Sequence, residues 1–117
     1  MKERRQFVRL DTRLPVQYIV LSDGVPRSGA TKDIGGGGIC LFAEQPLLPG
    51  TRLRVSMGLP GRAEPSVFTA EVAWCESYEV IGKTERNQQT EIGVRFVEIA
   101  PADRDAILQW VILSFTS

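Results

Sequence analysis

The sequence of 117 residues contains no histidine. This absence removes the commonest general base, the commonest metal ligand and the usual partner of a nucleophilic serine or cysteine. The remaining residues offer no pair or triad that would activate a nucleophile, and no cofactor motif. The sequence therefore predicts that the protein is not an enzyme, needs no cofactor and binds no metal ion.

Cysteines are also scarce, since only Cys40 and Cys75 are present. They lack the CxxC spacing of common zinc sites, so a zinc site is not expected. Both lie in apolar segments, where a buried free thiol is expected. Two thiols without a signal peptide predict a reducing, cytoplasmic location. Long apolar runs are missing as well. No run approaches the roughly 18 residues that span a bilayer, so membrane insertion is not expected.

The sequence also has no excess of either charge, because 14 basic residues balance 14 acidic ones. Net charge therefore provides no attraction to nucleic acid or to a membrane surface. The distribution is uneven, however, and residues 2–13 carry five basic against two acidic side chains. We expect residues 1–13 to form a basic arm that leads into the first strand.

What the sequence does contain is repeated alternation of apolar and polar residues, which is typical of half-buried antiparallel strands. Turn-forming residues separate the alternating segments, and the polar segment 79–89 is expected to be a loop. Five or six such strands predict a small barrel or sandwich. The alternating segments are 14–22, 38–43, 51–59, 67–76 and 90–99.

The last segment changes to a helical period. Pro101 suits the first helical position, and Asp103 and Asp105 would lie near the positive end of the helix dipole. The apolar residues at helical spacing are Ile107, Leu108, Val111, Ile112 and Phe115. We expect one amphipathic helix that packs on the barrel, although docking of a partner remains an alternative. The chain is expected to be a single domain, 1–117, with the arm over 1–13, the barrel over 14–100 and the helix over 101–115.

Candidate binding residues lie first in the arm. Arg5 and Arg9 form an RxxxR motif, with Arg4 beside it. Guanidinium groups suit phosphate and the edge of guanine, because both accept two parallel hydrogen bonds. A solvated basic tail that aids solubility is the alternative interpretation of the same residues.

A second candidate is the glycine run, in which Asp33, Gly35 and Gly38 follow a DxGxxG spacing. Consecutive glycines allow a ligand to approach the backbone N–H groups, and a nearby carboxylate can accept the paired N–H donors of guanine. The alternative is a glycine-rich turn or bulge between strands. It is not a phosphate-binding P-loop, because no GK[ST] follows it.

Two further residues are weaker candidates. Trp74 would stack on a base, but its strand face also contains Phe68 and Val72, so packing in the core is favoured. Arg95 points away from the apolar face of its strand and would border a site, although a plain surface charge is favoured.

Taken together, residues 4–9 and 33–38, followed by "ICLFAE" and "EIGVRFVEI", resemble the PilZ domain over residues 3–115. The resemblance implies a mainly β fold: a small six-stranded antiparallel β-barrel with an N-terminal basic arm and one C-terminal α-helix. It also implies binding of cyclic di-GMP through RxxxR and [DN]xSxxG motifs. The implied binding residues are Arg4, Arg5, Arg9, Asp33, Gly35 and Gly38, whereas Trp74 and Arg95 remain the weaker candidates named above.

In this interpretation, ligand binding orders the arm and signals to an unidentified partner protein in motility, exopolysaccharide or pilus control. Neither DNA nor RNA is expected to bind, and the protein is expected to be a monomer or a weak homodimer. One alternative is a degenerate PilZ-like adaptor that binds no nucleotide and acts through protein contacts. Another is an unrelated small barrel that binds single-stranded nucleic acid, which zero net charge and few aromatic residues disfavour.

The motif departs from the family pattern at Gly35, where the family has serine. A lost hydrogen bond weakens binding by about 0.5–1.5 kcal/mol, or by up to about 3 kcal/mol when its partner is charged. We therefore predict that Gly35→Ser maintains or raises the affinity for cyclic di-GMP in calorimetry. A large loss of affinity would instead show that the turn requires the backbone freedom of glycine.

Overall fold

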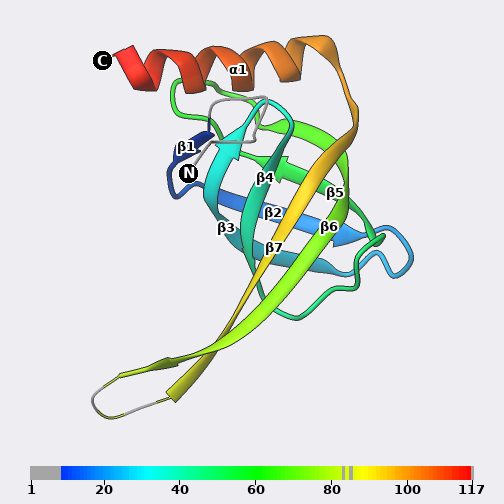
Figure 1. Ribbon diagram of the computed structural model, residues 1–117. Helices are drawn as coiled ribbons and strands as arrows, with labels where there is room; N and C mark the ends of the chain where they lie inside the picture. The colour runs from blue at the N-terminus through cyan, green and yellow to red at the C-terminus, as the bar shows by residue number, and fades with distance from the viewer. Residues whose placement is uncertain (1–8, 83, 85, 117) are drawn as a thin grey trace.

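The structure is a computed structural model that describes residues 9–82, 84 and 86–116, with the side chains of residues 86, 115 and 116 left aside. The described chain contains seven strands and one helix (Figure 1). In chain order these are β1 (Arg9–Asp11), β2 (Pro15–Val20), β3 (Pro26–Gly35), β4 (Gly38–Ala43), β5 (Arg52–Met57), β6 (Ser66–Ile81), β7 (Arg86–Ile99) and α1 (Pro101–Thr116).

Six of the strands close into a barrel. Strand order runs β2, β3, β4, β7, β6 and β5, and β5 pairs again with β2, with every neighbouring pair antiparallel. The short strand β1 lies outside this closed circuit and pairs only with the end of β3. The prediction of a six-stranded antiparallel barrel with one C-terminal helix is therefore confirmed.

The barrel interior is filled by the apolar residues of the predicted alternation. In β2 and β5, Val16, Tyr18, Leu53 and Val55 point inward, and each is at most 2% exposed. Their neighbours in sequence are mostly polar or charged and are exposed or partly exposed. The hydrophobic effect thus determines which face of each strand points inward.

One strand of the barrel has no clear alternation in its sequence. β3 reads PRSGATKDIG, and its register against β4 shifts between Thr31 and Asp33. It is a strand because β2 and β4 hydrogen-bond to its two edges along the barrel wall. Backbone pairing of this kind does not require apolar side chains, which is why the periodicity does not reveal it.

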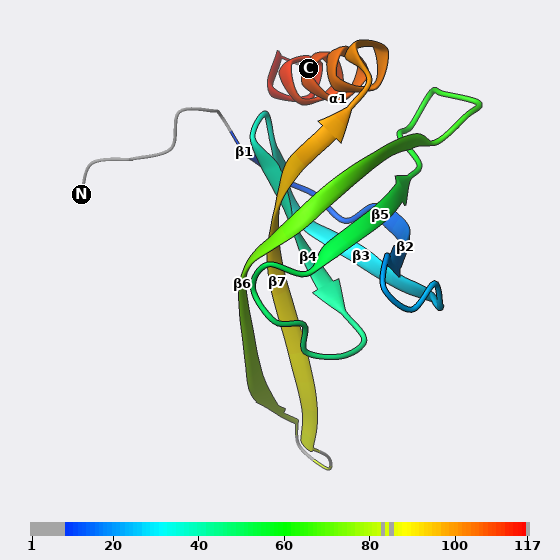
Figure 2. The same cartoon turned by 90° about the vertical axis from the view of Figure 1, so that its right-hand side faces the viewer.

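The prediction of a loop over 79–89 is wrong. β6 continues to Ile81, β7 begins at Arg86, and the two remain paired from Tyr78 opposite Gln89 to Ile81 opposite Arg86. This hairpin projects well beyond the barrel (Figures 1 and 2). Its side chains are mostly exposed, so cross-strand backbone bonds maintain the pairing where burial does not.

Helix α1 lies across one end of the barrel, at the opposite end from the hairpin (Figure 2). Ile107 and Val111 face the core and are 1% and 3% exposed. The expectation that Ile112 shares their face is wrong, since it is 61% exposed. Residues four apart lie on one side of a helix, whereas the next residue is rotated by about 100°. Phe115 has its side chain outside the described residues. No helix in the described ranges is both long and apolar enough to cross a membrane.

Gly38 begins β4 where that strand runs very close to β7. A Cβ atom at this position would lie 2.1 Å from the carbonyl oxygen of Val94. Positive φ angles in the described residues occur at other glycines, Gly24, Gly50 and Gly61. Gly38 is therefore required for the space between two strands, and not for a left-handed backbone.

We predict that Gly38→Ala destabilises the fold by about 1–3 kcal/mol, because the added methyl group must push two paired strands apart. The free energy of unfolding in urea measures this effect. Gly58→Ala is the matched control, since a Cβ atom there meets nothing within 4 Å. The control should change stability by less than about 0.5 kcal/mol. Equal stability of the two variants would contradict the prediction.

Candidate functional site

The arm enters the structure at β1, and the hydroxyl group of Thr31 anchors the chain just after it. Thr31 is fully buried; its Oγ1 accepts a hydrogen bond from the backbone N–H of Leu14 at 2.8 Å and donates one to the carbonyl of Thr12 at 2.5 Å. The N–H of Thr12 also donates to the carbonyl of Lys32 at 3.1 Å. These bonds fix the base of the arm against β3, so the position of Arg9 follows from the barrel.

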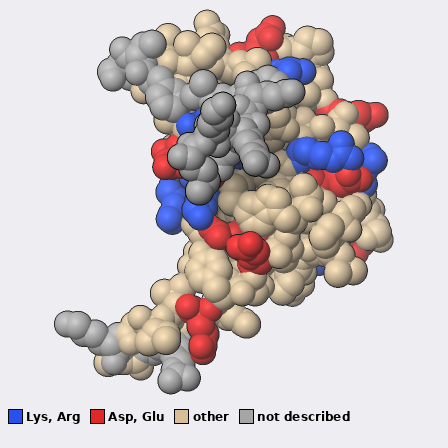
Figure 3. All heavy atoms as spheres, in the orientation of Figure 1, with Lys and Arg blue, Asp and Glu red and all other residues tan. Residues whose placement is uncertain are grey.

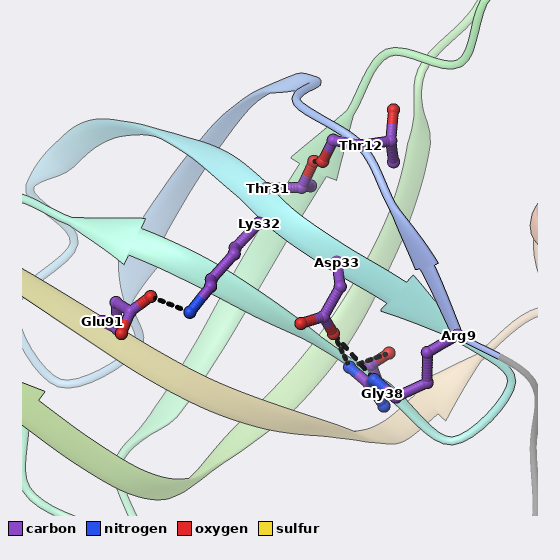
Figure 4. Close-up of polar contacts among 7 residues, drawn as sticks. All are labelled: Arg9, Thr12, Thr31, Lys32, Asp33, Gly38 and Glu91. Carbon is purple, nitrogen blue, oxygen red and sulfur yellow. Dashed lines mark hydrogen bonds and ion pairs between the residues drawn. The ribbon is translucent and has the colours of Figure 1, made fainter.

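Arg9 reaches from β1 to two residues of the glycine-rich segment (Figure 4). Its Nε donates to Asp33 Oδ1 at 2.7 Å, and its Nη2 lies 2.5 Å from the same oxygen. Nη2 also approaches the carbonyl oxygen of Gly38 at 3.4 Å. The two charged side chains are only 19% and 14% exposed. The fold thus brings Arg9, the second arginine of the RxxxR motif, into contact with Asp33 and Gly38, which are remote from it in sequence.

A second ion pair crosses the outside of β4 nearby. Lys32 extends from β3 to Glu91 on β7, with its Nζ 2.6 Å from Glu91 Oε1 (Figure 4). The Glu91 side chain is 7% exposed, and its hydrogen bond raises the pKa of the Lys32 ammonium group. This pair is not predicted from the sequence. Its only trace there is a charged residue, Glu91, directly before the apolar alternation of Ile92 and Val94.

A hollow of about 230 Å³ lies beside these contacts on the outer face of the barrel, and we call it the outer-face hollow. It brings together Arg9, Asp33, Gly38, Trp74 and Arg95 from the predicted site. Gly35 is not part of its lining but pairs with Arg9 in the β1–β3 register. Arg4 and Arg5 lie outside the described residues. The full lining is Arg9, Asp33, Gly37, Gly38, Ile39, Cys40, Ala73, Trp74, Gly93, Val94 and Arg95.

The favoured prediction for Trp74, packing in the core, is wrong. Its side chain is on the outer face and 42% exposed. The register of β6 against β7 shifts between Val72 and Trp74, so a β-bulge inserts one residue and reverses the alternation. Val72 is still buried, and Cys75 now packs against the core in place of Trp74. The indole consequently borders the outer-face hollow.

Arg95 has the surface exposure that the sequence predicts, at 58% of its side chain, and it also borders the hollow. Its guanidinium group donates to Glu71, which Arg52 contacts as well at 3.1 Å. The hydrogen bond from Arg95 lowers the pKa of Glu71 below its ordinary value. Arg95 is therefore a surface cation that Glu71 holds in place at the edge of the hollow.

Cys40 lines the hollow but is 4% exposed and forms no disulfide. Burial raises the pKa of its thiol to about 11, and the nearby carboxylates of Asp33 and Glu91 add to this effect. The thiol is therefore protonated at neutral pH, where it is a poor nucleophile. Within the described ranges, no cluster of three or more cysteine, aspartate and glutamate residues is arranged to bind a metal ion.

The surface around the site has mixed charge. On the face drawn in Figure 3, Lys and Arg atoms lie among Asp and Glu atoms and do not form an extended field of one sign. Such a surface gives little attraction to a long polyanion.

The Arg9–Asp33 contact gives a testable prediction. A double-mutant cycle with Arg9→Ala and Asp33→Ala should show a coupling energy of about 1–3 kcal/mol, because both side chains are largely buried and the hydrogen bond is charged. The free energy of unfolding in urea is the measurement. The control pair is Arg62–Asp103, whose nitrogen and oxygen are 3.7 Å apart and whose side chains are 35% and 22% exposed, so it should couple more weakly. Equal coupling in the two cycles would contradict the geometry.

Comparison with known proteins agrees with the architecture. The sequence profile of the PilZ domain matches residues 3–113. The solved PilZ domain of YcgR from Escherichia coli, with c-di-GMP, has 21% identity and a TM-score of 0.76, and the match covers 97% of this chain and 92% of that one. No curated protein sequence matches significantly.

Two longer proteins share the fold. MotI/DgrA, the inhibitor of motility of Bacillus subtilis, has 25% identity and a TM-score of 0.76, with coverage of 98% of this chain and 53% of that one. The MrkH–c-di-GMP complex of K. pneumonia has 17% identity and a TM-score of 0.74, with coverage of 98% and 52%. The chain therefore spans about half the length of these two proteins. Because the family profile matches nearly the whole sequence, this chain belongs to the PilZ domain family.

Proposed function

We propose that this chain is a receptor module for cyclic di-GMP. The observation that carries the proposal is the meeting of Arg9, Asp33 and Gly38 beside one outer-face hollow. These residues belong to the two motifs that the sequence shares with the family. The related solved structures of the YcgR domain with c-di-GMP and of the MrkH–c-di-GMP complex support the same ligand.

The ligand's chemistry matches the groups around the hollow. Cyclic di-GMP has two guanine bases and two phosphates in a compact dianion, and Arg9 provides a cation beside it. Both contacts from Arg9 end on Oδ1 of Asp33, so Oδ2 is able to accept N–H donors of a guanine. Trp74 offers an aromatic surface at the same hollow, and stacking of a base on such a ring contributes about 1–3 kcal/mol.

The two other candidate arginines, Arg4 and Arg5, stand a few residues before β1 in the sequence. Arg5 is four residues before Arg9, a distance of at most about 13 Å along an extended chain. Arg4 and Arg5 would bring further guanidinium groups to the phosphates. We infer that the arm is ordered over the ligand and that this ordering is the signal to a downstream protein. The module would thus act as a receptor and not as a catalyst.

Titration calorimetry with cyclic di-GMP tests the proposal. We expect a dissociation constant in the micromolar range or tighter, and the same titration gives the number of ligand molecules bound. Cyclic di-AMP is the control, because it has the same charge but lacks the guanine edge that Asp33 would recognise. Absence of heat with cyclic di-GMP would reject the receptor and favour the adaptor that acts through protein contacts.

Variants of the arm test the named residues. Arg9→Ala and Arg5→Ala should each weaken binding by about 1.5–3 kcal/mol, since each removes charged hydrogen bonds to the ligand. Arg27→Ala is the matched control, because Arg27 bonds Asp23 and is not part of the lining of the hollow. If calorimetry gives the same affinity for Arg9→Ala as for the control, Arg9 is not in the site.

A further inference from the structure

The indole of Trp74 occupies the space that a side chain at position 93 would need. Trp74 on β6 and Gly93 on β7 are direct cross-strand partners. A Cβ atom at Gly93 would lie 2.1 Å from the indole Nε1, 2.3 Å from Cε2 and 2.8 Å from Cζ2. Real Cβ atoms do not approach other atoms so closely. The indole can therefore occupy this position only because residue 93 is a glycine without a side chain.

Two features of the strands produce this contact. The β-bulge before Trp74 turns its side chain to the outside of the barrel, and the outward position opposite is Gly93. The two neighbours of Gly93, Ile92 and Val94, are almost fully buried in the core. Gly93 belongs to the outer face but is buried, as expected if the indole covers it.

We propose that Gly93 is a positioning residue for Trp74. Its bare backbone seats the indole against β7, and the exposed part of the ring faces the outer-face hollow as a stacking wall for a purine base. This use of the ring depends on the proposed function, whereas the seat does not. A side chain at position 93 would push the indole toward the space that the ligand needs.

Packing alone does not account for the arrangement. Trp74 is 42% exposed and does not belong to the buried core cluster, so the ring contributes little to the interior. Glycine inside a strand is destabilising relative to alanine and often marks a site of close approach. An open aromatic ring beside Arg9 and Arg95 provides both a stacking surface and cations, which together suit a nucleotide.

The seat is tested first without ligand. The sequence has two tryptophans, so Trp110→Phe leaves Trp74 as the single reporter. In this background, Gly93→Ala should shift the emission of Trp74 to longer wavelength and increase its quenching by acrylamide. Gly58→Ala, where a Cβ atom meets nothing within 4 Å, should leave both signals unchanged. Unchanged signals in Gly93→Ala would overturn the seat.

The role in binding is tested by a double-mutant cycle with cyclic di-GMP. Trp74→Ala should weaken binding about 5- to 150-fold if the ring stacks on a base. Gly93→Ala should weaken it within the same range, and combining the two should add little, because both act through the indole. If the two losses multiply instead, Gly93 acts independently of Trp74 and the proposal fails.

The proposal is also tested if Gly93→Ala fails to fold. If Gly93→Ala does not fold, adding Trp74→Ala should restore the fold, since the clash is with the indole; an unfolded double variant would overturn the seat. If the wild-type protein binds no cyclic di-GMP, the proposed function fails, and with it the stacking role. The fluorescence and the restored folding still decide whether Gly93 seats the ring.

Discussion

The site depends on how the two edges of β3 are shared among its neighbours. β4 pairs along one edge, while β2 pairs along the other edge only as far as Ala30. The remaining length, Asp33 to Gly35, is left for β1, which places Arg9 opposite Gly35. From this position the guanidinium group reaches Asp33 and the carbonyl of Gly38. A short strand outside the closed barrel therefore connects the basic arm to the glycine-rich segment.

Two irregularities in the strands place chemical groups on the outer face and leave the interior apolar. The register shift in β3 adds Lys32 beside Asp33 on the outside of the barrel, and the bulge in β6 turns Trp74 outward. Bulges of this kind commonly redirect side chains near functional sites. The barrel core remains complete, because Ile34 and Val72 on either side of these shifts are still buried. The core residues and the proposed site thus lie on opposite faces of the same strands.

Charges on the outer face are largely held by partners before any ligand arrives. Arg9 is held by Asp33, Lys32 by Glu91, and Arg95 by Glu71. Pairing of this kind fixes side chains that would otherwise lose conformational entropy on binding, so under the proposed function these pairs would preorganise the site.

The inward faces of β2 and β5, the start of the helix at Pro101 and the motif residues Arg9 and Asp33 are predictable from the sequence alone. Burial of alternate residues and capping are local effects, so a local pattern reveals them. Three features become visible only in the folded chain: Trp74 faces outward, the chain around residue 80 is a paired hairpin, and Lys32 contacts Glu91. Each of these depends on which strand lies alongside, because a bulge or a backbone ladder exists only against a partner and leaves no period in its own sequence.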